Sequence, residues 1–212
     1  MDLSNIQVIT LKFDATKPTP YSTSPSAGTI IIIKTKQVII ILLLHRYIMS
    51  LGVLKLYNRC VSTFGASLGK RLFSLGFCWK APYFWTIRPL VEDLKAGRAV
   101  VSMPHRKMSC NHIGTQHAIA CCNLVEMCMG TITEATLPSH LRWIPRGMTV
   151  QYVAKATGTL TATSEIDPIE FFKLDKYPGN VQVPVIVTDK DGKEVVTAHV
   201  ELYISEKPAK KE

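Results

Sequence analysis

Glu126 is the residue whose setting in this 212-residue chain most clearly calls for a chemical explanation. Between Lys107 and Glu134 it is the only Asp, Glu, Lys or Arg, and the residues around it are mostly apolar. A carboxylate in apolar surroundings loses hydration energy, so it must be paired, protonated or used in chemistry. Two interpretations follow: a general base or nucleophile, or a buried acid that is satisfied by Asn111 or by a neighbouring chain.

A helix start that could bind a carbonyl or phosphate oxygen is predicted twelve residues before Glu126. The apolar pattern predicts one helix over residues 115–132, apolar nearly all round and therefore buried, and Gly114 ends the loop before it. The first backbone N–H groups of a helix are unpaired and lie at the positive end of its dipole. His112 and His117 flank this start as candidate hydrogen-bond donors.

The spacing between these two features constrains any joint mechanism. At a rise of about 1.5 Å per residue, Glu126 lies roughly 18 Å along the helix from Gly114. One copy of Glu126 therefore does not reach a group held at its own helix start. If both features act on one substrate, the geometry predicts a symmetric dimer with two shared sites.

The sequence Asn-His-Ile-Gly-Thr-Gln-His-Ala, followed by Asn-Leu-Val-Glu, carries a resemblance to a known superfamily. The pattern Asn-x-x-Gly-x-x-His, with an acid fifteen positions after the Asn, resembles the hotdog-fold acyl-CoA thioesterases of the phenylacetyl-CoA type. It is most similar to a largely uncharacterised branch of that superfamily. The matching positions are Asn111, Gly114, His117, Leu124 and Glu126.

The resemblance implies a role for each of these residues. Glu126 would be the general base that activates water, or the nucleophile that attacks the thioester carbonyl. Backbone N–H groups near His117 and Ala118 of the partner chain would polarise the thioester oxygen, and Asn111 would position water or substrate. The residues expected to contact the substrate are Gly114, Thr115, Ala118 and Asn123. No metal ion or other cofactor is expected.

Two departures from the family pattern suggest an alternative function. The thioesterases usually have Gly-Gly after the histidine, where this chain has Ala118-Ile119, whose side chains could narrow the approach to the backbone. The Ser or Thr often found one turn after the acid is Gly130 here. The alternative is a non-catalytic acyl-CoA-binding or interaction module of the same fold. A lyase acting on hydroxyacyl-CoA is a third hypothesis, but the His and Asp spacing that such enzymes use is not evident.

The fold class expected is α+β: a long antiparallel hotdog sheet wrapped around one central apolar helix, with an additional N-terminal helix. The apolar and β-branched runs predict strands separated by short turns, the last turn being Asp-Lys-Asp-Gly. The expected strands cover residues 83–90, 99–103, 143–156, 157–166, 181–188 and 194–204.

Four segments are expected along the chain. Residues 1–48 are a leader that is disordered or extraneous, with an apolar segment at 30–44 and with Met49 as the natural start. Residues 49–80 form the N-terminal helical segment, 81–205 the hotdog domain and 206–212 a charged tail. Two lysines inside residues 30–44 argue against a membrane span, and membrane contact is expected only there.

Charge and cysteines indicate partners and compartment. Residues 15–91 carry ten Lys or Arg and no acid, whereas residues 92–212 carry fourteen of each sign, so the neutral body argues against nucleic-acid binding. Six cysteines without framework spacing indicate reduced thiols in an intracellular protein, most of them filling the core. The cytoplasm is expected, or the mitochondrion if the basic stretch from Met49 acts as a targeting helix.

The partners expected are an acyl-CoA and a second copy of the chain, and the dimers could pair further into a tetramer. The tryptophans, with Tyr83 and Phe84, are expected to pack in the core or to line an acyl tunnel.

Overall fold

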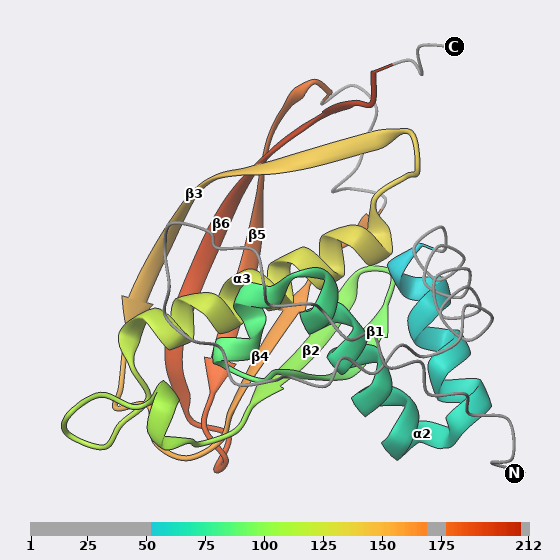
Figure 1. Ribbon diagram of the computed structural model, residues 1–212. Helices are drawn as coiled ribbons and strands as arrows, with labels where there is room; N and C mark the ends of the chain where they lie inside the picture. The colour runs from blue at the N-terminus through green and yellow to red at the C-terminus, as the bar shows by residue number, and fades with distance from the viewer. Residues whose placement is uncertain (1–51, 169–176, 209–212) are drawn as a thin grey trace, which may run out of the picture. The chain divides into compact units, whose positions relative to one another are not determined.

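Six strands form an antiparallel sheet in the computed structural model, which describes residues 52–168 and 177–208. Their order across the sheet is β1-β2-β4-β5-β6-β3, which leaves β1 and β3 at the two edges (Figure 1). Inward-facing residues alternate along the strands, as the buried Val181, Val183, Val185 and Val187 of β5 illustrate. The strands are β1 (Leu90–Lys95), β2 (Arg98–Met103), β3 (Leu141–Tyr152), β4 (Leu160–Glu165), β5 (Gly179–Thr188) and β6 (Glu194–Glu206).

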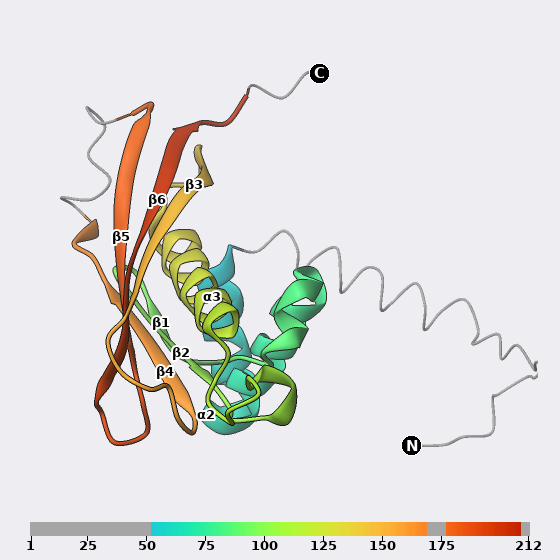
Figure 2. The same ribbon diagram turned by 90° about the vertical axis from the view of Figure 1, so that its left-hand side faces the viewer.

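The helix α3 (Ala118–Thr136) lies against one face of this sheet (Figure 2). It contacts β1, β2, β4, β5 and β6. Leu124, Met127 and Ile132 are fully buried against the sheet, and most of the helix from Asn123 to Thr133 is buried with them. The expected fold class, a long antiparallel sheet with one apolar helix on it and an added N-terminal helix, is therefore confirmed.

The N-terminal helix α2 (Val53–Lys80) packs mainly against β1. It breaks at Gly65, whose φ of 78° is a conformation that glycine adopts easily, so that it consists of segments 53–64 and 66–80. The segments approach closely at Gly69, where an added Cβ would lie 2.4 Å from the carbonyl oxygen of Cys60. Ser74 Oγ anchors the second segment by accepting a hydrogen bond of 2.9 Å from the Val91 N–H.

One expectation between α2 and β2 was wrong. The aromatic run over residues 83–90 is not a strand, because Pro82–Thr86 forms the short 3-10 helix η1. Pro82 starts this turn, and the Thr86 hydroxyl closes it by donating 2.8 Å to the Tyr83 carbonyl. The first strand comes later, and β1 and β2 meet in the tight turn at Gly97.

The expected core packing of the aromatic residues was also wrong for three of them. Trp79 is 64% exposed, Tyr83 61% and Trp85 38%, whereas Phe84 packs against Phe77. The leader, with its apolar segment 30–44, lies outside the described residues. Among those the structure does describe, no helix is long and apolar enough to cross a membrane.

Candidate active site

The loop before α3 is held together by Asn111. Its Oδ1 accepts hydrogen bonds of 3.1 Å from the N–H groups of Ile113 and Thr115, and its Nδ2 donates 2.8 Å to Thr115 Oγ1. Gly114 sits in this turn with a φ of 80°. Because the side chain is engaged in its own loop, Asn111 does not satisfy Glu126 within one chain, and its direct structural effect is to fix the turn.

His117, rather than Gly114, stands at the beginning of the helix. The expected start at residue 115 was three residues too early, because Gln116 and His117 are extended: Gln116 bridges to Cys110, and the His117 N–H donates 2.8 Å to the Ser109 carbonyl. His117 is the N-cap of α3, with Nδ1 accepting 3.1 Å from the Ile119 N–H. An Nδ1 that accepts leaves the proton of the neutral ring on Nε2, so this exposed imidazole has a donor to offer.

Backbone donors are available at this helix start. The N–H of Ile119 is used by the His117 cap and that of His117 by Ser109. The N–H groups of Ala118 and Ala120 have no acceptor in the part of the chain that the structure describes. Ala118 is exposed, so its N–H is accessible to a ligand oxygen. Of the two backbone donors expected near His117 and Ala118, only that of Ala118 is available, because the His117 N–H is bonded to Ser109.

Glu126 lies on a half-exposed face of α3, together with Ile119 and Cys122 at helical spacing. Within residues 52–168 and 177–208 its carboxylate has no hydrogen-bond or ion-pair partner. It is half-buried in the single chain rather than enclosed. The Glu126 side chain on this face is thus accessible to solvent or to another chain.

The edge strand β3 borders this face along its length. Tyr152 lies near the start of α3, where its hydroxyl is 3.2 Å from both Cys122 Sγ and the Ala118 carbonyl oxygen. At the other end, Trp143 Nε1 donates 2.9 Å to Glu134 Oε1. Glu126 lies between these two contacts along the helix, so its carboxylate belongs to the part of the molecule that borders the open sheet edge.

Asn123, one turn before Glu126, carries a buried oxygen without a partner. It is 4% exposed, and its Nδ2 donates 2.8 Å to Thr86 Oγ1. The Thr86 hydroxyl donates its only proton to the Tyr83 carbonyl, so its oxygen must accept from Asn123. This fixes which end of the Asn123 amide points toward Thr86. Asn123 Oδ1 has no hydrogen-bond partner among the described groups, which leaves a buried acceptor beside the acid.

The sequence-predicted residues fall into two groups within one chain. Asn111, Gly114, Thr115, His117 and Ala118 lie in the loop and helix start, whereas Asn123 and Glu126 lie further along α3. The nine residues from His117 to Glu126 correspond to roughly 14 Å of helix. The single chain therefore does not bring the helix start and the carboxylate onto one substrate atom.

Burial raises the pKa of several groups around α3. Desolvation raises the pKa of the Cys121 thiol to about 11 and that of the Cys128 thiol to about 12. Desolvation is also the main cause that raises the pKa of the Tyr152 hydroxyl to about 12, and its hydrogen bond with Cys122 adds to the effect. These groups are protonated at neutral pH, so they do not supply a nucleophilic thiolate or phenolate.

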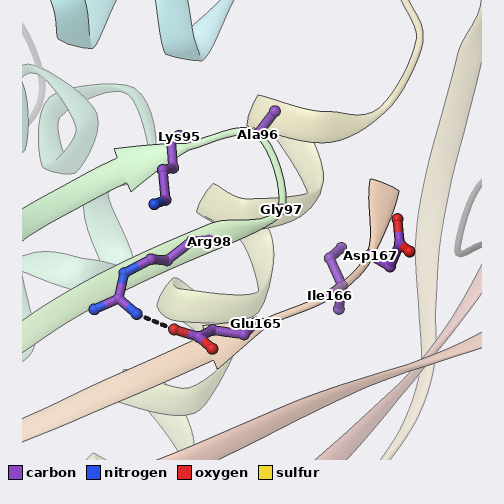
Figure 3. A pocket seen from close by; sticks show the side chains of 7 residues that line it. All are labelled: Lys95, Ala96, Gly97, Arg98, Glu165, Ile166 and Asp167. Carbon is purple, nitrogen blue, oxygen red and sulfur yellow. Dashed lines mark hydrogen bonds and ion pairs between the residues drawn. The ribbon is translucent and has the colours of Figure 1, made fainter. Parts of the chain in front are cut away.

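A surface hollow of about 490 Å³ lies elsewhere, at the β1–β2 turn (Figure 3). Arg98 dominates it and pairs with Glu165 and, at 3.1 Å, with Asp93. The Gly97 N–H donates 3.0 Å to Thr136 Oγ1, which places the hollow at the C-terminal end of α3. This hollow therefore lies about ten residues of helix beyond Glu126 and holds none of the predicted site residues.

Three residues that shape the site were not predicted from the sequence, namely Ser109, Thr86 and Tyr152, and a fourth, Trp143, was expected only to pack in the core or to line an acyl tunnel. The Ser109 carbonyl orders His117, and Thr86 orients Asn123. Tyr152 and Trp143 reach α3 from a strand that is not adjacent to it in the chain. Their aromatic character was visible in the sequence, but no local spacing links them to the helix.

Comparison with known proteins places the chain in a family. A family model described as a domain of unknown function, DUF4442, matches residues 69–204. None of the curated proteins matches the chain. The structural-genomics protein APC5556 is 40% identical, covers 71% of this chain and 99% of its own length, and superposes with a TM-score of 0.62.

Two further solved structures share the fold at low identity. A protein of unknown function from Pseudomonas aeruginosa, described as a probable thioesterase, is 19% identical, with a TM-score of 0.59 and coverage of 65% of this chain and 94% of its own. A thioesterase from Staphylococcus aureus is 16% identical, with a TM-score of 0.51 and coverage of 58% and 98%. These likenesses confirm the hotdog fold of thioesterase-family proteins.

Proposed function

Because this chain belongs to the DUF4442 family and has the hotdog fold of thioesterase-family proteins, we propose that it hydrolyses an acyl-CoA thioester. The observation that carries the proposal is the carboxylate of Glu126, which has no partner among the described residues, on the same helix as the Ala118 N–H, which has no acceptor among them. A base for water and a backbone donor for a developing oxyanion are the two parts that thioester hydrolysis needs.

The site is assembled by a homodimer in this proposal. Among the strands that the structure describes, the edge strand β3 pairs only with β6, although it is twelve residues long and exposes Ile144 and Tyr152. The free backbone N–H and C=O groups along a long edge strand are a template for another strand. Pairing of β3 with its copy across a two-fold axis extends the sheet and brings the second α3 toward Glu126.

The chemistry divides between the two chains. The Glu126 carboxylate takes a proton from water while the water oxygen bonds to the thioester carbonyl carbon. The N–H of Ala118 from the second chain donates to the oxyanion of the tetrahedral intermediate. The intermediate then breaks its C–S bond, and the CoA thiolate recovers the proton from Glu126. The products are a carboxylic acid and free CoA.

Asn123 and the helix start contribute to substrate binding in this scheme. The Oδ1 of Asn123, which has no partner among the described groups, accepts a hydrogen bond from the bound substrate or from the attacking water, which satisfies a buried acceptor. Thr115 and Gly114 shape the backbone next to the CoA moiety, and Asn111 acts as a positioning residue through its three bonds to that loop.

The test is hydrolysis of short, medium, long and aromatic acyl-CoAs by the full chain, with release of the free acid followed by mass spectrometry. Glu126→Gln keeps the size of the side chain and removes the base, so turnover should fall by at least about a hundredfold. Glu134→Gln, eight residues or just over two turns further along α3, is the matched control and should retain activity. Undiminished turnover by Glu126→Gln contradicts the proposal.

One observation favours a second candidate function, a non-catalytic acyl-CoA-binding module. Ile119 follows the open N–H of Ala118 directly, and its side chain is 58% exposed at the helix start. A bulky apolar side chain beside the donor hinders the approach of a thioester oxygen. Saturable acyl-CoA binding with no hydrolysis of any substrate, restored to hydrolysis by Ile119→Gly, would assign the native protein to this second function.

A further inference from the structure

A continuous run of hydrogen bonds joins the edge strand β3 to the imidazole of His117. Tyr152 is the last residue of β3, which ends beside the start of α3 (Figure 1). Its hydroxyl donates 3.2 Å to the Ala118 carbonyl oxygen. In the same peptide group, the Ile119 N–H donates 3.1 Å to His117 Nδ1. One peptide group therefore receives a hydrogen bond from Tyr152 and passes one on to the imidazole.

The direction of these hydrogen bonds is fixed by the number of protons. A tyrosine hydroxyl has one proton, and Tyr152 gives it to the Ala118 carbonyl. The contact of 3.2 Å between Cys122 Sγ and the Tyr152 hydroxyl oxygen is then a bond that the thiol donates. Burial raises the pKa of the Tyr152 hydroxyl to about 12, so the phenol keeps its proton at neutral pH. All the donors consequently point the same way, from Cys122 toward His117.

Hydrogen bonds that point the same way strengthen one another. A peptide carbonyl that accepts a hydrogen bond polarises the N–H of the same peptide group, which becomes a better donor. The bond from Tyr152 to the Ala118 carbonyl therefore strengthens the bond from the Ile119 N–H to His117. Cys122 adds to the effect, because a hydroxyl that accepts a hydrogen bond is itself a better donor.

The ring of His117 depends on this bond for its orientation. Its side chain is exposed, and within the described part of the chain its hydrogen bond is the one from the Ile119 N–H. An Nδ1 that is held as an acceptor places the proton of the neutral ring on Nε2. Stronger donation to Nδ1 therefore favours the tautomer that offers an Nε2–H at the helix start, where the Ala118 N–H is also accessible.

The same residues connect the two parts of the candidate active site. Cys122 lies one turn before Glu126 on the half-exposed face of α3. Tyr152 belongs to β3, the strand that pairs with its copy in the proposed dimer. The hydroxyl of Tyr152 thus ties the strand that meets the second chain to the donors that serve the site shared with that chain.

We propose that Tyr152 is a positioning residue for the thioester hydrolysis. By its bond to the peptide group between Ala118 and Ile119, it holds His117 in the tautomer whose Nε2–H donates to an oxygen of the bound acyl-CoA. Cys122 supports Tyr152 as the donor to its oxygen. The role rests on the proposed function, because it adds an imidazole donor to that reaction and leaves Glu126 as the base.

Tyr152→Phe tests this bond directly, since it removes the hydroxyl and keeps the ring. Loss of one hydrogen bond that supports the transition state should lower kcat for acyl-CoA hydrolysis by about tenfold and change KM by less than about twofold. Tyr203→Phe is the matched control. Tyr203 lies on β6 between the buried Leu202 and Ile204, so it points to the face of the sheet away from α3. This control should keep the kcat of the wild type.

Two substitutions of Cys122 separate its donor from its packing. Both shorten the side chain, but Cys122→Ser keeps a proton that can be donated to Tyr152, whereas Cys122→Ala removes it. Cys122→Ala should therefore lower kcat by about threefold more than Cys122→Ser does. Equal values of kcat in the two variants would overturn the part assigned to Cys122.

Nuclear magnetic resonance of 15N-labelled histidine rings gives a readout that a general loss of packing does not move. Protonated and unprotonated ring nitrogens have separate signals, and His117→Asn identifies those of His117. At about pH 8 the wild type should show His117 with the proton on Nε2, and Tyr152→Phe should show more of the form with the proton on Nδ1. The Ile119 amide should also exchange its proton with solvent faster in Tyr152→Phe. Tyr203→Phe should match the wild type in both measurements.

Two results would overturn the proposal. The first is an unchanged kcat in a folded Tyr152→Phe whose oligomeric state matches that of the wild type. The second is a His117 tautomer that Tyr152→Phe leaves unchanged. If Tyr152→Phe does not fold, the tautomer in Cys122→Ala and Cys122→Ser decides in its place. A wild-type chain that hydrolyses no acyl-CoA, or full activity of Glu126→Gln, would instead refute the proposed function itself.

Discussion

Trp143 lies over Gly130, so that a Cβ atom added to Gly130 would be 3.7 Å from Trp143 Cη2. The indole is fixed there by its hydrogen bond of 2.9 Å to Glu134. This pair joins the edge strand β3 to α3 one turn after Glu126. The position where related thioesterases often have a hydroxyl is thus occupied in this chain by the contact between a glycine and an indole ring.

Gly130→Ala should therefore stabilise the protein. The space accommodates a methyl group at ordinary van der Waals distance from Trp143, and alanine in a helix interior is favoured over glycine by roughly 0.5–1 kcal/mol. Urea unfolding should show that the free energy of unfolding rises by this amount. A loss of stability together with a shift in tryptophan emission would show that the ring packs more tightly on Gly130 than the 3.7 Å spacing allows.

His117 can be tested separately as a helix cap and as a functional imidazole. His117→Ala removes the acceptor for the Ile119 N–H and should cost about 1 kcal/mol of unfolding free energy. His117→Asn supplies another cap acceptor and should keep most of that stability. If the imidazole serves only as a cap, His117→Asn retains acyl-CoA hydrolysis; if its Nε2–H contacts substrate, both variants lose activity alike.

Asn123 should influence substrate binding more than folding. Asn123→Ala removes an oxygen that has no partner in the described chain, so the loss of stability should be limited to the bond with Thr86, about 1 kcal/mol. If substrate or water bonds to Asn123 Oδ1, kcat/KM should fall by about tenfold. Thr86→Val removes the Thr86 bond alone and serves as the control; an equal kinetic loss in both variants would assign Asn123 a structural role.

Stability should fall in alkaline solution because of the buried thiols. The pKa of Cys128 is raised from 9.0 to about 12 by burial, so the native state keeps a proton that the unfolded chain releases above pH 9. Its contribution to stability is complete below pH 9 and is lost as the pH rises toward 12, by about 1.4 kcal/mol per pH unit. Urea unfolding at pH 8, 9 and 10 should show a shallower decline in Cys128→Ala than in the wild type. Equal slopes would contradict this origin of the decline.

Much of the fold was predictable because its patterns are local. Alternating burial in β5 and β6 and the apolar character of α3 appear directly in the sequence. The aromatic run after Pro82 misled the strand prediction, since aromatic residues are frequent in strands. The run forms the 3-10 helix η1 instead, because Pro82 starts the turn and the Thr86 hydroxyl bonds to the Tyr83 carbonyl.

The candidate site was less predictable, for two physical reasons. The start of α3 depends on an imidazole cap, which the usual Ser, Thr, Asp and Asn signals do not include. The neighbours of Glu126 come from β3, so that Tyr152 and Trp143 reach the helix only through tertiary packing. The position of Glu126 on the helix was predictable; its place between two contacts of α3 with the edge strand was not.

The most direct test of the central claim is complementation between two inactive variants of the full chain. Glu126→Gln removes the base. Ala118→Pro removes the backbone donor and suits the first position of a helix, because His117 already has an extended ψ of 139°. Each variant alone should be inactive, and mixed dimers should contain one intact site that combines Glu126 of one chain with Ala118 of the other. After subunit exchange, verified by native mass spectrometry, an equal mixture should recover about a quarter of the wild-type acyl-CoA hydrolysis. No recovery in a mixture that demonstrably exchanges subunits would contradict a site shared between two chains.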